Sequence, residues 1–239
     1  MHRLLTGSLK VDRLTIPIVG LPSALDGTTI VQLSDLHYDG KRLSDTLLEQ
    51  AIEATNQAQP DLVVITGDFV TDDPAPIYPL ALQLKHLRSR AGVCAILGNH
   101  DLYRRSSRAT ITEALTNIDV SVLWDQVVYP LGEGLAIVGL PECWSPAFKA
   151  SRILDQVPPD VPRIVLAHNP DCADLLQQWR VDLQLSGHTH GGQIVIPGLG
   201  NISALSAKLY SRLPTRTRNR LPFLRACYRV MKHWEWSKG

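Results

Sequence analysis

Several short segments of the sequence place histidine and acidic residues one or two positions apart, next to glycine. They are SDLH, TGD, GNHD and SGHTHGG, and each follows a run of apolar residues. Histidine nitrogen and carboxylate oxygen, without thiolate, suit Mn²⁺, Fe or Zn²⁺ better than a closed structural zinc site. These segments therefore predict chemistry in which bound cations activate water.

Seven side chains are candidate metal ligands, which is more than one tetrahedral ion needs. The number fits two ions that share a bridging carboxylate, as in in-line displacement at phosphorus. Any one of them alone is as well explained by a helix cap, a turn or a structural hydrogen bond. Taken together, they favour a metal centre, because five of the chain's eight histidines lie among them or next to them. The candidates are Asp35, His37, Asp68, Asn99, His168, His188 and His190.

Six apolar, β-rich runs lead into these side chains and predict the strands that position them. Helix-like stretches at 44–59, 106–118 and 171–179 alternate with the runs, and Ser44 is a plausible N-cap. Alternating strands and helices indicate an α/β domain, whose ligand crevice forms beyond the carboxyl ends of the strands. The expected strands lie within 28–35, 61–68, 93–100, 135–142, 162–169 and 181–188.

The spacing within the segments suggests how neighbouring ligands pair. Residues two apart in an extended chain point to the same side, so Asp35 pairs with His37 and His188 with His190. The glycines around the H-x-H segment, such as Gly187, permit a close backbone approach that larger residues would obstruct. We therefore expect the H-x-H segment to act as a clamp at the end of its strand.

The motifs, in this order, resemble those of the calcineurin-like metallophosphoesterases. They are D-x-H at 35–37, G-D at 67–68, G-N-H-D at 98–101, a single histidine at 168 and G-H-x-H at 187–190. The amino-acid sequences around the first and last motifs are most similar to those of a bacterial branch that includes membrane-associated phosphodiesterases and UDP-2,3-diacylglucosamine pyrophosphatases. The resemblance implies a four-layer α/β/β/α sandwich of two facing mixed sheets.

The resemblance also implies a role for each ligand. One metal would take Asp35, His37, Asp68 and His190. The second metal would take Asp68, Asn99, His168 and His188. Asp68 would bridge the two ions, and a metal-bridging hydroxide would attack phosphorus without a covalent phosphoenzyme.

Four further residues beside the motifs are candidates for catalysis or binding. In the family, the histidine at the position of His100 stabilises the transition state or protonates the leaving oxygen, and Asp101 would orient it. Arg104 and Arg105 either contact a substrate phosphate or form an exposed charged turn, and the turn is slightly favoured. Glu142 replaces an aspartate-rich loop of many relatives, and its role is left open.

The leading prediction is a binuclear metal-dependent hydrolase of phosphoester or pyrophosphate bonds, with two Mn²⁺, Fe²⁺/Fe³⁺ or Zn²⁺ ions. Its anionic substrate would be a lipid-linked nucleotide diphosphate, a small phosphodiester or, as the disfavoured class, a nucleic acid. The alternative from another class is a non-catalytic binding module on a phosphoesterase fold, because fold alone does not guarantee chemistry. A phosphoprotein phosphatase is a weaker third reading. The oligomeric state is not predicted.

The C-terminal end of the chain differs in composition from the motif-bearing part. We expect a catalytic domain at 1–200 and a basic, aromatic-containing segment at 201–239, with nine Lys or Arg and one acidic residue. That segment could dock on an anionic membrane, bind nucleic acid or form a solvated basic stretch. It lacks the closing-strand sequence of relatives, so we expect either a sandwich without its usual C-terminal strands or a second sheet that is closed differently. Residues 11–22 are expected to form an edge strand.

Composition places the chain in the cytoplasm, with the option of peripheral contact with a membrane. The four cysteines are scattered without C-x-x-C spacing and are expected to be free thiols in a reducing compartment. No apolar run approaches the roughly 20 residues of a membrane span, and the N-terminus lacks a signal-peptide core.

Overall fold

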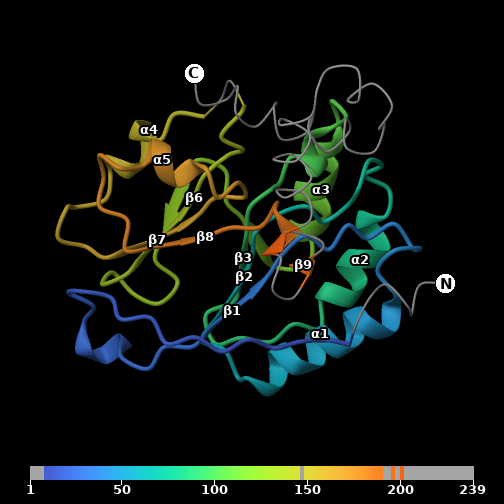
Figure 1. The fold of residues 1–239 in the computed structure, drawn as a ribbon, viewed down its shortest axis with the longest axis horizontal. Coiled ribbons are helices and arrows are strands. Elements are labelled where there is room, and N and C mark those ends of the chain that lie inside the picture. The colour runs from blue at the N-terminus through green and yellow to red at the C-terminus, as the bar shows by residue number, and fades with distance from the viewer. Residues whose placement is uncertain (1–7, 146–147, 191–194, 197–199, 202–239) are drawn as a thin grey trace. The chain divides into compact units, whose positions relative to one another are not determined.

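A computed structural model describes residues 8–145, 148–190, 195–196 and 200–201 (Figure 1). The chain divides into two compact units, Met1–His188 and Thr189–Gly239. In the second unit, strands β9 (Val195–Ile196) and β10 (Gly200–Asn201) pair antiparallel. The expected segment at 201–239 lies almost entirely outside the described residues, so the boundary at residue 200 stays a prediction.

Two four-stranded sheets form the frame of the first unit. The first sheet contains β1 (Ile30–Leu33), β2 (Leu62–Ile65), β3 (Val93–Ala95) and β4 (Val120–Val122), all parallel and in this order. The second contains β5 (Gln126–Val128), β6 (Ala136–Gly139), β7 (Arg163–Leu166) and β8 (Leu183–Leu185). Only β5 runs antiparallel to its neighbour, so the second sheet is mixed.

Alternating side chains along the central strands build three separate cores. Val63 and Ile65 point to one face of the first sheet, while Leu62 and Val64 point to the other, as the two-residue period of a strand requires. The core that contains Leu62 and Val64 also contains apolar residues of β6 and β7, so the two sheets face each other. The outer faces pack against helices. This is the predicted α/β/β/α arrangement.

The helices cover the two outer faces (Figure 1). α1 (Asp45–Gln57), α2 (Ile77–Leu84) and α3 (Ser107–Thr116) supply residues to the core of the first sheet. α4 (Ser151–Leu154) and α5 (Cys172–Leu175) supply residues to the core of the second. The Oγ of Ser44 accepts a hydrogen bond from the Leu47 N–H at 3.2 Å, which confirms the predicted N-cap. Short 3-10 helices occupy Ser23–Leu25 and His100–Leu102.

The sequence prediction was wrong in two places. Residues 11–22 form no strand; Ile18 and Leu21 instead pack against the core between the sheets. Pro17 and Pro22 lack the N–H that a ladder needs, which disfavours pairing. The helix expected at 171–179 ends at Leu175, after a single turn.

The cysteines and the lengths of the helices bear on two expectations from the sequence. Cys94, Cys143 and Cys172 are free thiols there, as expected, and Cys227 lies outside that part. Among the described residues, no helix has the length and apolar character needed to cross a membrane.

Candidate metal centre

The carboxyl ends of β1, β2, β7 and β8 meet at one edge of the sandwich. The His188 N–H donates to Asp35 Oδ1 at 2.8 Å, which joins the end of β8 to the end of β1. The His168 Nδ1 contacts the Thr66 carbonyl at 2.7 Å, which joins the end of β7 to the end of β2. Residues up to 154 positions apart in sequence are thereby brought together, with Gln32 of β1 donating to the Ser186 carbonyl.

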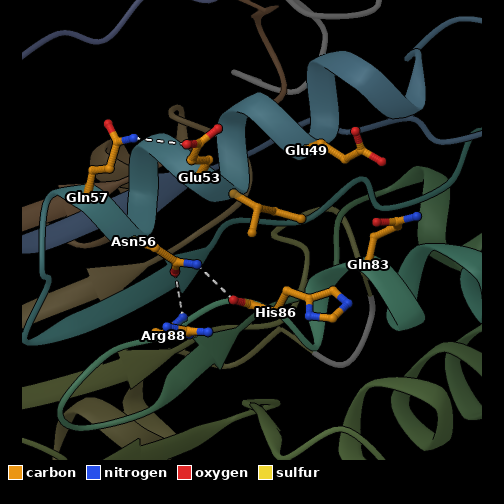
Figure 2. Close-up of a pocket in the computed structure, with 8 residues that line it drawn as sticks. Glu49, Glu53, Asn56, Gln57, Gln83, His86 and Arg88 are labelled. Atoms are coloured by element: carbon orange, nitrogen blue, oxygen red, sulfur yellow. Dashed lines mark hydrogen bonds between the residues drawn. The ribbon is translucent and has the colours of Figure 1, made fainter.

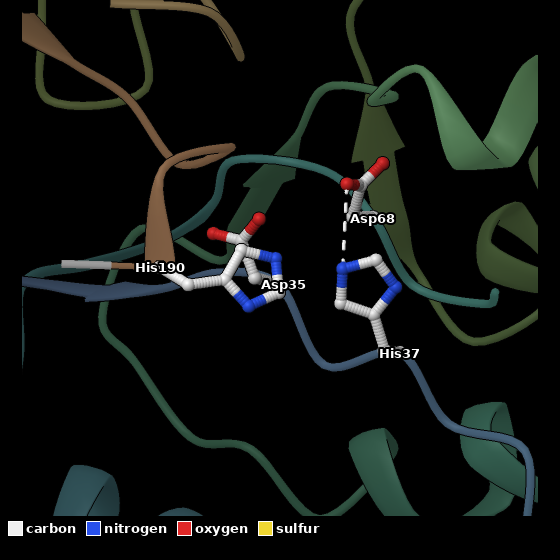
Figure 3. A group of neighbouring side chains, drawn as sticks. All are labelled: Asp35, His37, Asp68 and His190. Carbon is white, nitrogen blue, oxygen red and sulfur yellow. Dashed lines mark ion pairs between the residues drawn. The ribbon is translucent and has the colours of Figure 1, made fainter. Parts of the chain in front are cut away.

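Asp68 lies between the two groups of candidate ligands. Its Oδ2 is 3.5 Å from His37 Nε2 and 3.1 Å from His168 Nε2. One ligand atom each of Asp35, His37 and Asp68 lie within 4.8 Å of one another, and Figure 3 shows these side chains turned toward a common space. The same separation holds for Asp68, His168 and His188. Asp68, with 1% of its surface exposed, is the one first-unit residue shared by both groups.

Hydrogen bonds aim the ring nitrogens of the second group into the site. A carbonyl oxygen only accepts, so the bond to Thr66 places the proton of His168 on Nδ1 and leaves Nε2 for the site. Asn99 Oδ1 lies 3.1 Å from His168 Nε2 and 2.8 Å from His188 Nδ1. The amide oxygen of Asn99 thus stands beside both histidines, as a ligand of the same cation would.

The backbone at the strand ends is left-handed, which corrects the extended geometry expected for the paired residues. Among the described residues, eight that are not glycine have positive φ, and five of these eight are candidate ligands. Such conformations are strained and gather at functional sites. The pairing of Asp35 with His37 therefore comes from turned backbone and not from the two-residue period of a strand. The five are Asp35 (φ 53°), His37 (42°), Asp68 (55°), His188 (66°) and His190 (49°).

Two glycines allow the close approach that the strand ends need. A Cβ on Gly98 would overlap Asp68 Oδ1 and lie 2.7 Å from His168 Cε1. A Cβ on Gly187 would overlap Ser34 Oγ and lie 2.5 Å from Asp35 Oδ2. Glycine is required at both positions because the ligands occupy the space of a side chain, and this supports the close approach expected around the H-x-H segment.

His100 lies beside the first group. Its Nδ1 contacts the Thr71 carbonyl at 2.6 Å, and its ring packs edge-on against His37 with centroids 4.7 Å apart. The carboxylate of Asp101 accepts four backbone N–H groups. The catalytic roles expected for His100 and Asp101 stay predictions. The four donors belong to Gly98, Asp68, Phe69 and Val70.

Comparison with known proteins gives the family of this chain. A model of the calcineurin-like phosphoesterase family matches residues 28–192. This chain belongs to that family. It is 32% identical over 175 residues to "Phosphodiesterase YaeI" of Escherichia coli, an alignment that covers 72% of this chain and 63% of the relative. The chain therefore spans somewhat less than two thirds of that relative's length.

Two further likenesses extend this comparison. "UDP-2,3-diacylglucosamine pyrophosphatase LpxG" of Chlamydia trachomatis is 28% identical over 238 residues, which cover 79% of this chain and 71% of the relative. A solved structure of a phosphopantetheinyl hydrolase from Mycobacterium tuberculosis has a TM-score of 0.46 and 14% identity, over 68% of this chain and 83% of that one.

Asp68 and His168, two of the candidate ligands, shift each other's pKa. Burial disfavours the charged form of Asp68, yet its contacts with His168 and the His100 N–H lower the pKa of Asp68 overall. Burial alone would lower the pKa of His168, but the Asp68 carboxylate raises it to about 9. Each group therefore stabilises the charged form of the other, which is the electrostatic setting that a bound cation would take over.

The calcineurin-like phosphoesterase also buries a carboxylate behind the second group. Glu142 follows β6, has 4% of its surface exposed, and its Oε2 has no hydrogen-bond partner among the described residues. Burial raises the pKa of Glu142, and the neighbouring His168 opposes that shift. A buried oxygen without a partner calls for an explanation, and proximity to a cation site offers one.

Two exposed aromatic residues of the calcineurin-like phosphoesterase were missed by the sequence argument. Tyr103 packs edge-on against His100, and Trp144 packs edge-on against His188. Both stand within three residues of a residue that had been singled out, in DLYRR and LPECW. Proximity to those motifs was the available signal. Arg104 and Arg105, next to Tyr103, are exposed, in agreement with the favoured charged turn.

A separate hollow of the calcineurin-like phosphoesterase lies between α1 and the segment after α2 (Figure 2). It measures about 560 Å³ and is bounded by residues of α1 and by Gln83, His86 and Arg88. Asn56 Nδ2 donates to the His86 carbonyl at 2.9 Å, and the Arg88 N–H donates to Asn56 Oδ1 at 2.7 Å. None of its lining residues is a candidate ligand, so it serves below as a reference surface.

His190 is the one candidate ligand that falls in the second compact unit. It is exposed and has a left-handed backbone. That unit is described by itself, so the assignment of His190 to the first metal of this phosphoesterase stays a prediction.

Proposed function

We propose that this chain is a hydrolase of phosphodiester or pyrophosphate bonds that works with two divalent cations. The observation that carries the proposal is the position of Asp68 Oδ2, within 3.5 Å of His37 Nε2 and 3.1 Å of His168 Nε2. A single carboxylate between two histidine-containing groups suits a bridging ligand. Membership of the calcineurin-like phosphoesterase family supports the same reaction class.

The donor set fits two sites of oxygen and nitrogen ligands. Asp35, His37 and Asp68 would hold one cation, with His190 completing the set. Asp68, Asn99, His168 and His188 would hold the other. Each donor is a carboxylate, amide oxygen or imidazole, which suits Mn²⁺, Fe or Zn²⁺. When bound, the two cations would lower the pKa of water and neutralise charge that develops on the phosphate.

The chain's own residues would then orient the substrate and handle protons. In hydrolysis, the oxygen of water forms a bond to phosphorus, the phosphorus–leaving oxygen bond breaks, and the leaving oxygen takes up a proton. We assign delivery of that proton to Nε2 of His100. Its Nδ1 proton is engaged by the Thr71 carbonyl, which fixes the ring so that Nε2 is the exchangeable atom.

The substrate class is narrower than phosphate esters in general. Relatives are named as a phosphodiesterase and as a UDP-2,3-diacylglucosamine pyrophosphatase, so a small phosphodiester and a lipid-linked nucleotide diphosphate are the leading candidates. For a lipid-linked substrate, the basic segment at 201–239 would supply peripheral contact with an anionic membrane. Release of the monophosphate product from each candidate would rank them.

The direct test combines metal analysis with a chromogenic assay. The purified protein is expected to bind two Mn²⁺ per chain and to release p-nitrophenol from bis(p-nitrophenyl) phosphate, and a chelator should abolish turnover. Failure to bind divalent cations would overturn the proposal. Two bound cations without turnover on any diester or pyrophosphate would instead favour a binding module on this fold.

A further inference from the structure

Two exposed aromatic side chains stand against histidines of the candidate site: Tyr103 follows β3 of the first sheet, and Trp144 follows β6 of the second. The ring centroid of Trp144 lies 5.3 Å from that of His188, at 80° between planes. The centroid of Tyr103 lies 4.7 Å from that of His100, at 67°. Among the described residues, three large aromatic side chains are exposed, and the third is Tyr78 on α2. Two of the three therefore contact the site.

Core packing does not account for this placement. Tyr103 is 58% exposed and Trp144 is 46% exposed, and neither belongs to the three core clusters of the described residues. The exposed part of each ring gains no hydrophobic stabilisation from the fold itself. A ligand that covers these rings would gain that stabilisation.

The surroundings favour a planar group over an acyl chain. The exposed large aliphatic side chains of the described residues lie elsewhere, in the N-terminal segment, on α2 and on α5. Beside the site, rings contact rings, since Trp144 and Tyr103 each adjoin an imidazole. Offset and edge-on contacts between rings are directional, whereas an acyl chain needs a continuous apolar groove.

We propose that Tyr103 and Trp144, which we call the aromatic rim, bind a planar aromatic group carried by the phosphate ester. This assignment rests on the proposed hydrolase function, because the phosphate must lie at the cations for its substituent to reach the rim. The group is a nucleobase or a simple aryl ring. Stacking of such a ring on an aromatic side chain tolerates differences between bases, so the rim selects a class of ester and not one compound.

The test holds the leaving group constant and varies the other substituent. The Mn²⁺-loaded full-length protein hydrolyses the p-nitrophenyl esters of methyl phosphate, phenyl phosphate and thymidine 5′-monophosphate, and kcat/KM is measured for each. Trp144→Ala is expected to lower the thymidine-to-methyl ratio of kcat/KM by about tenfold. Trp144→Phe should keep most of the ratio, because it keeps a ring. Tyr78→Ala is the matched exposed control and should leave the ratio unchanged.

The three esters also separate the two sources of a planar group. A fall in both the phenyl and the thymidine ratios identifies any aryl ring as the ligand, and a fall in the thymidine ratio alone identifies a nucleobase. Equal losses of kcat/KM for all three esters in Trp144→Ala would overturn the aromatic rim, since Trp144 would then only support His188. A wild-type protein without any preference among the esters would overturn it as well.

Binding measurements keep this inference distinct from the proposed function. If no ester is hydrolysed, the hydrolase proposal fails, and calorimetry with thymidine 5′-monophosphate and with inorganic phosphate then tests the rim alone. Tighter binding of the nucleotide that Trp144→Ala removes would support the aromatic rim. Equal affinity for nucleotide and phosphate would refute it. Turnover without any ring preference refutes only the aromatic rim.

Discussion

The segments that follow β1, β2 and β3 and those that follow β6, β7 and β8 contribute different kinds of side chain to one centre. Backbone hydrogen bonds hold the segments after β1, β2 and β3, since the carboxylate of Asp101 accepts four N–H groups and Asp68 Oδ1 accepts the His100 N–H. The segments after β7 and β8 are oriented by residues of the first sheet's segments: the Thr66 carbonyl fixes His168, and Asp35 accepts the His188 N–H.

This asymmetry suggests a division of work between the two halves. The first half supplies Asp68, the proposed bridge, and His100, the proposed acid, both of which the proposed reaction needs for any ester. The second half carries the exposed Trp144, which contacts His188, and the buried Glu142, which interacts electrostatically with His168. Damage to the first half should therefore affect both cations, and damage to the second should stay local.

The largest effect is expected for Asp68→Asn, because a neutral amide cannot serve as the anionic bridge between two cations. We expect the variant to lose tight binding of both Mn²⁺ ions, and kcat to fall by at least about a thousandfold, as when a central electrostatic group is removed. Calorimetric titration with Mn²⁺ and the chromogenic diester assay measure the two effects. Asp61→Asn, at the other end of β2, is the control, with native turnover expected. Retention of one tight cation would contradict the shared role.

The next effect separates catalysis from metal binding within the first half. His100→Ala should keep both cations, because His100 is outside the two candidate ligand groups, yet lose about a hundredfold to a thousandfold in kcat through loss of the acid. Metal content and kcat are measured on the same sample. His86→Ala, in the hollow of Figure 2, is the exposed histidine control. Full turnover of metal-loaded His100→Ala would remove His100 from the mechanism.

A third change tests whether the first half is held by its own backbone. Asp101→Asn replaces an acceptor of four N–H groups with an amide that keeps one oxygen, so buried donors are left unpaired. The free energy of unfolding should fall by about 2–3 kcal/mol, as measured by urea denaturation of the metal-free protein. In the control Asp39→Asn, the remaining amide oxygen can still accept the Lys41 and Arg42 N–H groups, which both donate to one oxygen on an exposed loop, so the cost should be at most about 0.5 kcal/mol. Equal losses in the two variants would contradict a special role for the buried network.

Much of this arrangement was predictable from sequence because the signals are local. All six predicted strands exist, since buried strands of a sandwich are continuous apolar runs bounded by polar residues. The candidate ligands follow those runs directly, so their types and order could be read from the chain. Family resemblance then supplied the two-sheet arrangement, which strand periodicity alone does not determine.

What sequence could not supply depends on contacts between distant residues. The resemblance paired Asp101 with His100, and nothing in the sequence indicated that the Asp101 carboxylate also accepts the N–H groups of Phe69 and Val70, about thirty residues away. The left-handed backbone at Asp35 and His37 follows from tertiary crowding at the sheet edge, which overrides the extended preference. The exposure of Trp144 is likewise a property of the packed structure, because an isolated tryptophan is more often buried.

The smallest effect is expected in the second half, at Glu142. Its buried carboxylate lies near enough to His168 and Asp68 to act on both electrostatically. A bound cation would favour the charged carboxylate, and the charged carboxylate would in turn favour the cation, because each stabilises the other. Glu142→Gln keeps the shape and removes the charge, so the affinity for the second Mn²⁺ should fall by about tenfold, as for groups that support direct ligands.

The first Mn²⁺ should lose less affinity than the second in Glu142→Gln, because Glu142 acts most on His168, which belongs to the second group alone, and less on the shared Asp68. Calorimetry of the metal-free protein measures both affinities in one titration, and Glu133→Gln, an exposed glutamate, is the control. An equal fall in the affinity for both cations would show that the charge of Glu142 acts on both cation sites, and it would contradict the division between the two halves. Unchanged affinity for both would mean that the buried Glu142 oxygen is satisfied in some other way than by proximity to a cation.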